Sequence, residues 1–400
     1  MAKRDPHKCE ETYKKWLAKG APMQGVKKPM YDLAMQFLQD MEIGANVSPS
    51  APKGPRSYIR LINQRTKMHS WAIILQKELG VESWDELKDK EMEMLRLTKR
   101  MRDGEIKARK NRGQPLKAIG TYVKAFKSFW NWYCRVKRKE GIQIPDITVD
   151  MDGRDAKPPF NYFTLEQMKL LCDEAKYDYR VLMMFLFDSG IRAPTELLNV
   201  KVSDLEWDDR NKIYVLHIRD EVSKTFGRKI KLMLCSSILK EYIEREGHKL
   251  HDYVFNKTHE QMNSYLRRLG YRVLKIGKID KKYGGKKSNY VTKGIRLYDF
   301  RHCSACYWLP RYKSEAALKY RFGWKKSDMI HYYTDFMGMM DTIETEDLYV
   351  DVSKMELEKQ MEQKNREVEL LQEQLSEQGQ KLQKVMQILE ALELEKKAKC

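Results

Sequence analysis

Four side chains in the C-terminal half of the chain are of the types needed to break a phosphodiester bond when no metal ion is present. They are two isolated arginines, Arg192 and Arg301, an aromatic hydrogen-bond donor, Trp324, and a late tyrosine, Tyr333. A phosphate under attack carries its charge on the non-bridging oxygens, and the planar guanidinium fork can donate to two of them at once. A tyrosine oxygen can hold the phosphate in a covalent intermediate. The set indicates nucleophilic transfer at a phosphate.

The order and spacing of these residues resemble those of the tyrosine recombinases, the phage-integrase family of site-specific DNA recombinases. The likeness rests on four segments: Ser189-Gly190-Ile191-Arg192, Leu297-Tyr298-Asp299-Phe300-Arg301-His302, Gly323-Trp324 and Tyr332-Tyr333-Thr334. It implies that Tyr333, nine residues after Trp324, is the nucleophile. Its neighbour Tyr332 points about 100° away on a helix, so only one of the two can face the phosphate. The resemblance also implies that Trp324 donates its indole N–H to the phosphate.

The resemblance implies a general acid as well. In the family a lysine in a β-hairpin turn protonates the leaving 5′-oxygen. Here strands are predicted over residues 212–219 and 228–234, with Lys224-Thr225-Phe226-Gly227 as the turn between them, so Lys224 takes that role.

Two positions depart from the family pattern. The second arginine is usually preceded, three residues earlier, by His or Lys, whereas this chain has Tyr298. A phenol can donate to a phosphate but is a poor base near neutral pH, so the identity of the general base is open. The acidic residue usually found three after the first arginine is Glu196 here, four after Arg192, and His302 follows the second arginine. We expect Glu196 and His302 to buttress and orient the site.

The charge of the chain predicts a polyanionic partner. The formal net charge is +19, from 76 Lys+Arg and 57 Asp+Glu, and the last fifty residues hold 9 basic and 11 acidic side chains, so the remainder carries +21. Such a body attracts nucleic acid through phosphate neutralisation. Basic residues cluster in a helical region that we expect to grip the DNA backbone. They are Arg100, Arg102, Lys107, Lys110, Arg112, Lys117, Lys124, Lys127 and Arg135.

The predicted organisation is a mainly α fold with one small antiparallel β-sheet. Residues 1–55 are an extension, 56–145 a helical core-binding DNA-binding domain, 146–159 a linker rich in acids, Gly and Pro, and 160–345 a catalytic domain of the tyrosine-recombinase type. Helices are predicted over 58–79, 84–101 and 119–137, and the aromatic stripe of the third is expected to be core. Residues 277–292 are expected to form a basic loop.

Residues 353–395 predict a coiled coil. Met361, Val368, Leu375, Leu382 and Leu389 fall at position a of one heptad register, and Leu357, Leu371, Val385 and Leu392 fall at d. Lys364 and Gln378 are polar interruptions at d. The alternative is a single helix that folds back on its own chain, because Gly379 weakens the middle.

The sequence therefore predicts a tyrosine recombinase, of the archaeal or viral integrase type, that acts on double-stranded DNA. It is expected to need no cofactor and no metal, to assemble as a dimer or tetramer on DNA with help from the coiled coil, and to be cytoplasmic and nucleoid-associated. No apolar run approaches the ~18 residues of a membrane span. Seven scattered cysteines suit reduced thiols, and the Cys303–Cys306 pair has no second pair that would complete a zinc site. Two alternatives are a type IB topoisomerase and an architectural DNA-binding protein that no longer cuts.

Overall fold

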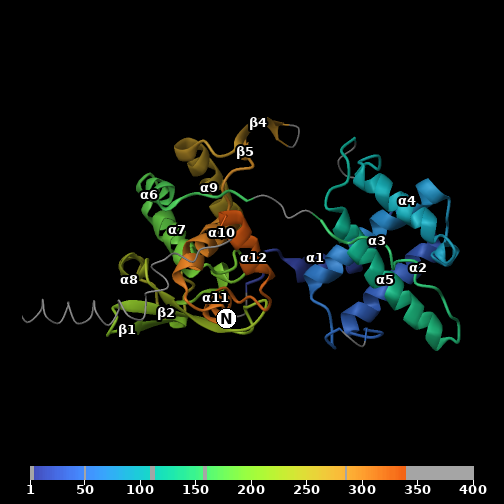
Figure 1. Ribbon diagram of the computed structural model, residues 1–400, viewed down its shortest axis with the longest axis horizontal. Helices are drawn as coiled ribbons and strands as arrows, with labels where there is room; N and C mark the ends of the chain where they lie inside the picture. The colour runs from blue at the N-terminus through green and yellow to red at the C-terminus, as the bar shows by residue number, and fades with distance from the viewer. Residues whose placement is uncertain (1–3, 49–50, 109–112, 156–159, 284–285, 339–400) are drawn as a thin grey trace, which may run out of the picture. The chain divides into compact units, whose positions relative to one another are not determined.

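The computed structural model describes residues 4–48, 51–108, 113–155, 160–283 and 286–338. Within these ranges the chain is mainly helical with a small antiparallel sheet, as predicted (Figure 1). Buried apolar side chains form two clusters: the N-terminal core, drawn from residues 13–151, and the C-terminal core, drawn from residues 163–303. No helix in the described ranges is long and apolar enough to cross a bilayer.

Five α-helices build the N-terminal core. They are α1 (Cys9–Ala18), α2 (Lys28–Ile43), α3 (Tyr58–Leu79), α4 (Glu91–Arg102) and α5 (Ile119–Lys139). On α5 the rings of Phe126, Phe129, Trp130 and Tyr133 are each 0% exposed, so the aromatic stripe is core, as expected. Burying aromatic rings of this size contributes a large part of the apolar surface that stabilises a small helical domain.

The N-terminal core differs from the sequence expectation in two ways. Residues 1–55 were predicted as a loosely specified extension with one short amphipathic helix over 30–39, whereas the structure has α1 and the longer α2, which pack against α3 and bury Tyr13 and Phe37. Helix α1 has only ten residues, so its apolar periodicity spans few turns. The predicted helix over 84–101 is interrupted, because a 3₁₀ turn η1 (Asp85–Leu87) precedes α4. Trp84 is 1% exposed and donates its indole N–H to the Met30 carbonyl at 2.8 Å, which fixes the chain ahead of this turn.

The C-terminal core is helical around one small sheet. Its helices are α6 (Leu165–Asp173), α7 (Tyr177–Ser189), α8 (Ser236–Arg245), α9 (His259–Leu274), α10 (Leu297–Trp308) and α11 (Glu315–Phe322), with 3₁₀ turns η2 (Leu197–Asn199), η3 (Val202–Asp204) and η4 (Leu309–Arg311). The Thr164 hydroxyl accepts the Gln167 backbone N–H, and the Gln167 side chain accepts the Thr164 N–H. This reciprocal capping box fixes the start of α6.

The sheet contains the predicted hairpin and one further strand. Strands β1 (Leu205–Asp208), β2 (Ile213–Ile218) and β3 (Arg228–Leu232) are antiparallel in the order β1-β2-β3. Leu216 pairs with Leu205 on one side and Ile230 on the other, so apolar residues meet across the face that packs on the core. The β2–β3 connection carries Lys224, as predicted.

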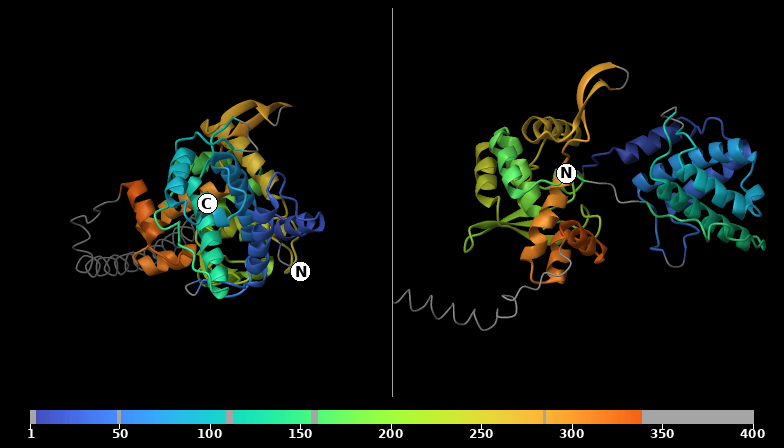
Figure 2. Two further views of the ribbon diagram at one scale, coloured as in Figure 1. Left: turned by 90° about the vertical axis from the view of Figure 1, so that its right-hand side faces the viewer. Right: turned by 45° about the horizontal axis from the view of Figure 1, so that its top comes forward.

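A second hairpin replaces the loop expected over residues 277–292. Strands β4 (Lys278–Tyr283) and β5 (Lys286–Thr292) pair antiparallel, and β5 packs against α9; Figure 2 shows the hairpin extending from the end of that helix. The loop prediction was wrong because strand pairing satisfies backbone groups whatever the side chains are, and the many lysines hide the apolar pattern.

Helix α12 (Asp328–Met337) belongs to a second compact unit that begins at Ser327. It begins with an acidic residue in its first turn and ends at Gly338, whose φ of 68° suits a helix end. The predicted coiled coil over 353–395 lies outside the described residues, as does the end of the predicted catalytic domain.

Candidate active site and nucleic-acid interface

A buried carboxylate ties two arginines together. Glu196 is 1% exposed; its Oε1 accepts from Nη1 of Arg192 at 2.9 Å, and its Oε2 accepts from Nη2 of Arg228 at 2.8 Å. Oε2 also accepts the backbone N–H of Arg192 at 2.8 Å. The extra residue between Arg192 and Glu196 therefore does not keep the two side chains apart. The carboxylate fixes the direction of the Arg192 guanidinium, as a buttress would.

The charge state of Glu196 follows from these bonds. Burial by itself would raise the pKa of the carboxyl, but the hydrogen bonds and charges of Arg228 and Arg192 outweigh burial and lower the pKa to about 2. Glu196 is therefore ionised at neutral pH and accepts from both guanidinium groups.

Arg228 is a residue that the sequence analysis missed. Its side chain is 0% exposed, and its Nε donates to the Arg321 carbonyl at 2.9 Å. It is the first residue of β3, where buried and exposed positions alternate, so it shares the inward face with Ile230 and Leu232. A charged residue at an inward strand position needs a buried partner of opposite charge. That position was the one signal in the sequence that could have identified it.

Gly323 brings separate segments against Arg192. Its carbonyl accepts from Nη2 of Arg192 at 2.8 Å and from the Thr225 hydroxyl at 3.0 Å. The residue has φ +61°, and a Cβ there would lie 3.1 Å from the nearest Arg228 nitrogen and 3.2 Å from Nη1 of Arg192. Both the backbone conformation and the close approach favour glycine.

Arg301 lies on α10 and is 3% exposed. Its Nη1 donates to the Gly190 carbonyl at 2.5 Å and its Nη2 to the Phe322 carbonyl at 2.7 Å. Within the described ranges no carboxylate forms an ion pair with it. Burial first, and then the charge of Arg192, lower the pKa of Arg301 to about 10, which still leaves it protonated at neutral pH. Arg192, Arg228 and Arg301 are three cations, and Glu196 is the carboxylate bonded to the first two, so the site has surplus positive charge suited to an anion.

Lys224 is exposed, in a turn whose neighbours are fastened to the same network. On one side the Ser223 hydroxyl donates to Oε1 of Glu196 at 3.4 Å; on the other, Nη1 of Arg192 donates to the Thr225 hydroxyl at 3.3 Å. The turn is thus held beside Arg192 while the lysine side chain faces solvent. This placement leaves the ammonium accessible to a bound substrate.

Tyr298 and His302 lie one helical turn apart on α10. Their rings meet edge to face with centroids 5.1 Å apart, and His302 stacks on Phe160 at 4.3 Å. Burial, followed by the Arg301 charge, lowers the pKa of His302 to about 4, so it is neutral and weakly basic at pH 7. Tyr298 is 45% exposed. The packed imidazole suits an orienting role, while the exposed phenol is accessible to a ligand.

The last two predicted site residues are both buried. Trp324 follows Gly323, is 8% exposed, and its ring stacks on Phe322 at 4.7 Å. On α12, Tyr333 is 2% exposed and Tyr332 is half-buried, with ring centroids 5.1 Å apart. The two tyrosines differ in environment within their own helix, as helical geometry requires of adjacent residues.

The predicted DNA-binding residues divide into groups. Carboxylates pair with Arg100, through Glu78 and Glu105, and with Arg102, through Asp152. Backbone carbonyls accept from Lys107, Lys127 and Arg135. Lys117 and Lys124 are exposed, and Lys110 and Arg112 lie outside the described residues. Internal ion pairs reduce the charge that Arg100 and Arg102 can offer a phosphate.

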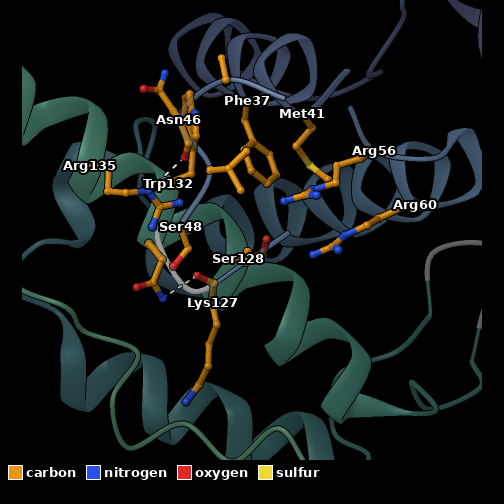
Figure 3. A pocket seen from close by; sticks show the side chains of 14 residues that line it. Phe37, Met41, Asn46, Ser48, Arg56, Arg60, Lys127, Ser128, Trp132 and Arg135 are labelled. Atoms are coloured by element: carbon orange, nitrogen blue, oxygen red, sulfur yellow. Dashed lines mark hydrogen bonds between the residues drawn. The ribbon is translucent and has the colours of Figure 1, made fainter. Parts of the chain in front are cut away.

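A basic pocket of about 350 Å³ opens on the N-terminal core (Figure 3). Its four cationic side chains are Arg56, Arg60, Lys127 and Arg135, and Phe37 and Trp132 form apolar walls. Burial first, and then the charge of Arg56, lower the pKa of Arg60. Arg56 and Arg60 were not predicted as DNA-binding residues from the sequence.

The described residues contain no cluster of three His, Cys, Asp or Glu side chains that could hold a metal ion. Cys303 and Cys306 lie on α10 and are 1% and 2% exposed. Burial raises the pKa of both thiols, so they are protonated and apolar in character.

Comparison with known proteins finds one family that matches part of the chain. Residues 161–338 match the phage integrase family. Among curated proteins none matches the chain.

Three solved structures with a similar fold are complexes with DNA. One is the Tn1549 transposon integrase with transposon right end DNA, at 15% identity and a TM-score of 0.52, covering 81% of this chain and 99% of that one. Another is the XerH site-specific recombinase bound to a palindromic difH substrate, at 14% identity and a TM-score of 0.53, covering 84% of this chain and 99% of that one. A third is a lambda integrase dimer bound to a COC′ core site, at 16% identity and a TM-score of 0.50, covering 79% of this chain and 80% of that one. At these identities the likeness is one of fold.

Proposed function

We propose that the chain is a site-specific DNA recombinase, since its residues 161–338 match the phage integrase family. The observation that carries the proposal is the pair of guanidinium groups of Arg192, which is partly buried, and Arg301, which is buried, held with a surplus of positive charge by the Gly323, Gly190 and Phe322 carbonyls. Preorganised donors of this kind stabilise charge that develops on a phosphate in the transition state.

In the proposed reaction the Tyr333 oxygen attacks the scissile phosphorus and forms a 3′-phosphotyrosyl bond. The bond from phosphorus to the 5′-oxygen breaks, and Lys224 gives that oxygen a proton, which leaves a 5′-hydroxyl. The hydroxyl of the partner strand then attacks the phosphotyrosine and releases Tyr333. Because the phosphotyrosine conserves the bond energy, rejoining needs neither ATP nor another activated reactant.

The other residues would bind and orient the phosphate. Arg192 and Arg301 donate to its non-bridging oxygens, Trp324 donates through its indole N–H, and Tyr298 through its hydroxyl. Glu196 and His302 act through these groups. With a pKa of about 4, His302 is too weakly basic to be the main acceptor of the Tyr333 proton at pH 7.

We assign double-stranded DNA as the partner and the helical region over 56–145 as its second contact. The four cations of the pocket in Figure 3 suit a phosphate of the DNA backbone. Arg56 and Arg60 thereby join the predicted set, and Arg100 and Arg102 become weaker members of it because acids already pair with them.

Self-association forms the last part of the proposal. Recombination joins two duplexes through four protomers, and the heptads of residues 353–395 supply an apolar seam for pairing chains. The sequence pattern alone supports this assignment.

A nicked suicide substrate tests the proposed function, because cleavage beside a nick releases a short fragment and traps the covalent complex. We expect an adduct on the chain's own recombination site that forms equally with and without EDTA. Adducts on many unrelated sequences would indicate a topoisomerase. Tight DNA binding with no adduct on any sequence would indicate an architectural protein and would overturn the proposal.

A further inference from the structure

The segment that leads into α1 contacts the C-terminal core through Arg4, which makes most of the polar contacts, and through His7, whose ring meets that of His259 edge to face at 5.1 Å. The Arg4 backbone N–H donates to Oδ1 of Asn199 at 2.7 Å, and Nδ2 of Asn199 donates back to the Arg4 carbonyl at 3.0 Å. A side-chain amide thus pairs with both backbone groups of one residue, as a neighbouring strand would.

The Arg4 side chain makes three further contacts. Its guanidinium lies 3.6 Å from the centroid of the Tyr253 ring and donates to the Phe255 carbonyl at 3.3 Å and to Oδ1 of Asn256 at 3.2 Å. Stacking and a two-point hydrogen-bond fork together recognise arginine better than lysine. The next residue, Asp5, accepts the Cys9 backbone N–H at 2.6 Å and so holds the first turn of α1.

Asn199 connects this segment to the active-site network. It is 1% exposed and lies in the same turn as Glu196, whose carbonyl accepts its backbone N–H at 3.0 Å. Without the Arg4 backbone, the buried Oδ1 would lose the donor described above, and a buried acceptor without a donor is destabilising. Its loss would favour rearrangement of the turn that holds Glu196.

A second connection runs toward Lys224. The Asn199 carbonyl accepts from Nη2 of Arg219 at 2.7 Å, and the Arg219 carbonyl in turn accepts the Val222 and Ser223 backbone N–H groups. These two residues lead directly into Lys224. One buried amide therefore lies between Arg4 and both halves of the site: the carboxylate that holds the arginines and the turn that carries the lysine.

We propose that residues 4–7 are a docking strap that positions the active site, with Arg4 as a positioning residue for strand cleavage. The inference rests on the proposed function for its activity readout. Arg4 touches neither the phosphate nor a group that touches it; it acts through Asn199. The binding groove on the C-terminal core, formed by Asn199, Tyr253, Phe255 and Asn256, is specific for an arginine-bearing segment of this chain.

The test compares full-length Arg4→Ala, Arg4→Lys and Lys169→Ala proteins. Lys169 is an exposed residue of α6, so its replacement removes the same single charge without altering the groove. The single-turnover cleavage rate on a nicked suicide substrate is measured at saturating DNA, and the dissociation constant by gel shift. Hydrogen–deuterium exchange of residues 195–200 and 219–224 is measured without DNA.

We expect Arg4→Ala to cleave about tenfold more slowly, since small displacements of positioned groups cost rate, while its DNA affinity stays within about twofold. Exchange in both segments should be faster. Arg4→Lys should be intermediate, because it keeps the cation over the ring and loses the fork. Lys169→Ala should match the wild type in all three measurements.

Each other outcome decides the question. Unchanged exchange in Arg4→Ala would mean that the strap does not dock, and faster exchange with a wild-type cleavage rate would mean that docking does not position the site; either overturns the inference. A fall in affinity with an unchanged rate at saturation would assign Arg4 to DNA binding, which also overturns it. If even the wild type forms no adduct, the proposed function fails, and the exchange measurement alone still decides whether the strap docks.

Discussion

Nη2 of Arg228 lies 2.8 Å from Oε2 of Glu196, with the two side chains 0% and 1% exposed. The same carboxylate accepts from Arg192, so a fully buried ion pair fixes the guanidinium proposed to bind the phosphate. Removing one partner of such a pair leaves an uncompensated charge, which is far costlier than removing an exposed pair.

Arg228→Ala should therefore lower the free energy of unfolding by about 3–5 kcal/mol. Cleavage should slow as well, because Arg228 would no longer fix the orientation of the carboxylate that holds Arg192. Urea denaturation and single-turnover cleavage measure the two effects. Lys229→Ala is the matched control, since this neighbouring side chain is 62% exposed and should cost about 1 kcal/mol or less. Equal stability of the two variants would contradict the buttress role of the pair.

Lys224→Ala should cleave slowly on an ordinary substrate and recover on one whose 5′ leaving atom is sulfur. A thiolate leaves without a proton, so the general acid becomes unnecessary. Rates on the two substrates, measured side by side, give the rescue. Lys229→Ala should cleave both normally. If sulfur fails to rescue the Lys224 variant, the lysine has another role.

Arg56→Ala combined with Arg60→Ala should weaken DNA binding at all sequences and flatten the salt dependence of log K by about two units, one for each phosphate that is no longer neutralised. Arg100→Ala combined with Arg102→Ala removes the same charge from groups already paired with acids, and should have the smaller effect. Gel shifts over a range of salt concentrations measure both. A larger effect of the Arg100 and Arg102 replacements would mean that the DNA-binding face lies around those two residues and not around the pocket.

Truncation after Asp351 should leave cleavage of a single site unchanged and reduce synapsis and complete recombination. The heptads provide a seam between chains, and the polar Lys364 and Gln378 at d should keep that association modest. Sedimentation of full-length and truncated proteins at matched concentration measures it. If both proteins sediment as monomers and recombine equally well, the segment makes contacts within its own chain instead.

A site residue could be predicted from the sequence only where the residues next to it in the chain form a recognisable motif. Arg192, Arg301 and Lys224 could be proposed as site residues because each lies in a local motif of recognisable type and spacing. Arg228 was missed because a strand with alternating basic residues has the same composition whether one of them faces inward or outward. Burial against Glu196 is a property of tertiary packing.

The same reasoning applies to the fold. The hairpin over residues 213–232 was predicted because its apolar alternation is clear, whereas the β4–β5 hairpin was missed because its side chains are mostly polar and only the backbone pairing defines it. Arg56, Arg60 and Arg4 are three among 76 basic residues, and nothing local separates a cation that lines a pocket or groove from one that is solvated.

Identifying the residue joined to DNA in the trapped complex tests the central claim most directly. Proteolysis of the suicide-substrate adduct and mass spectrometry should locate the 3′-phosphate on Tyr333, and Tyr333→Phe should form no adduct while binding DNA with nearly wild-type affinity, because only the nucleophilic oxygen is lost. Tyr332→Phe is the matched control and should still cleave. An adduct on Tyr332, or covalent trapping that survives in Tyr333→Phe, would contradict the assignment of the nucleophile.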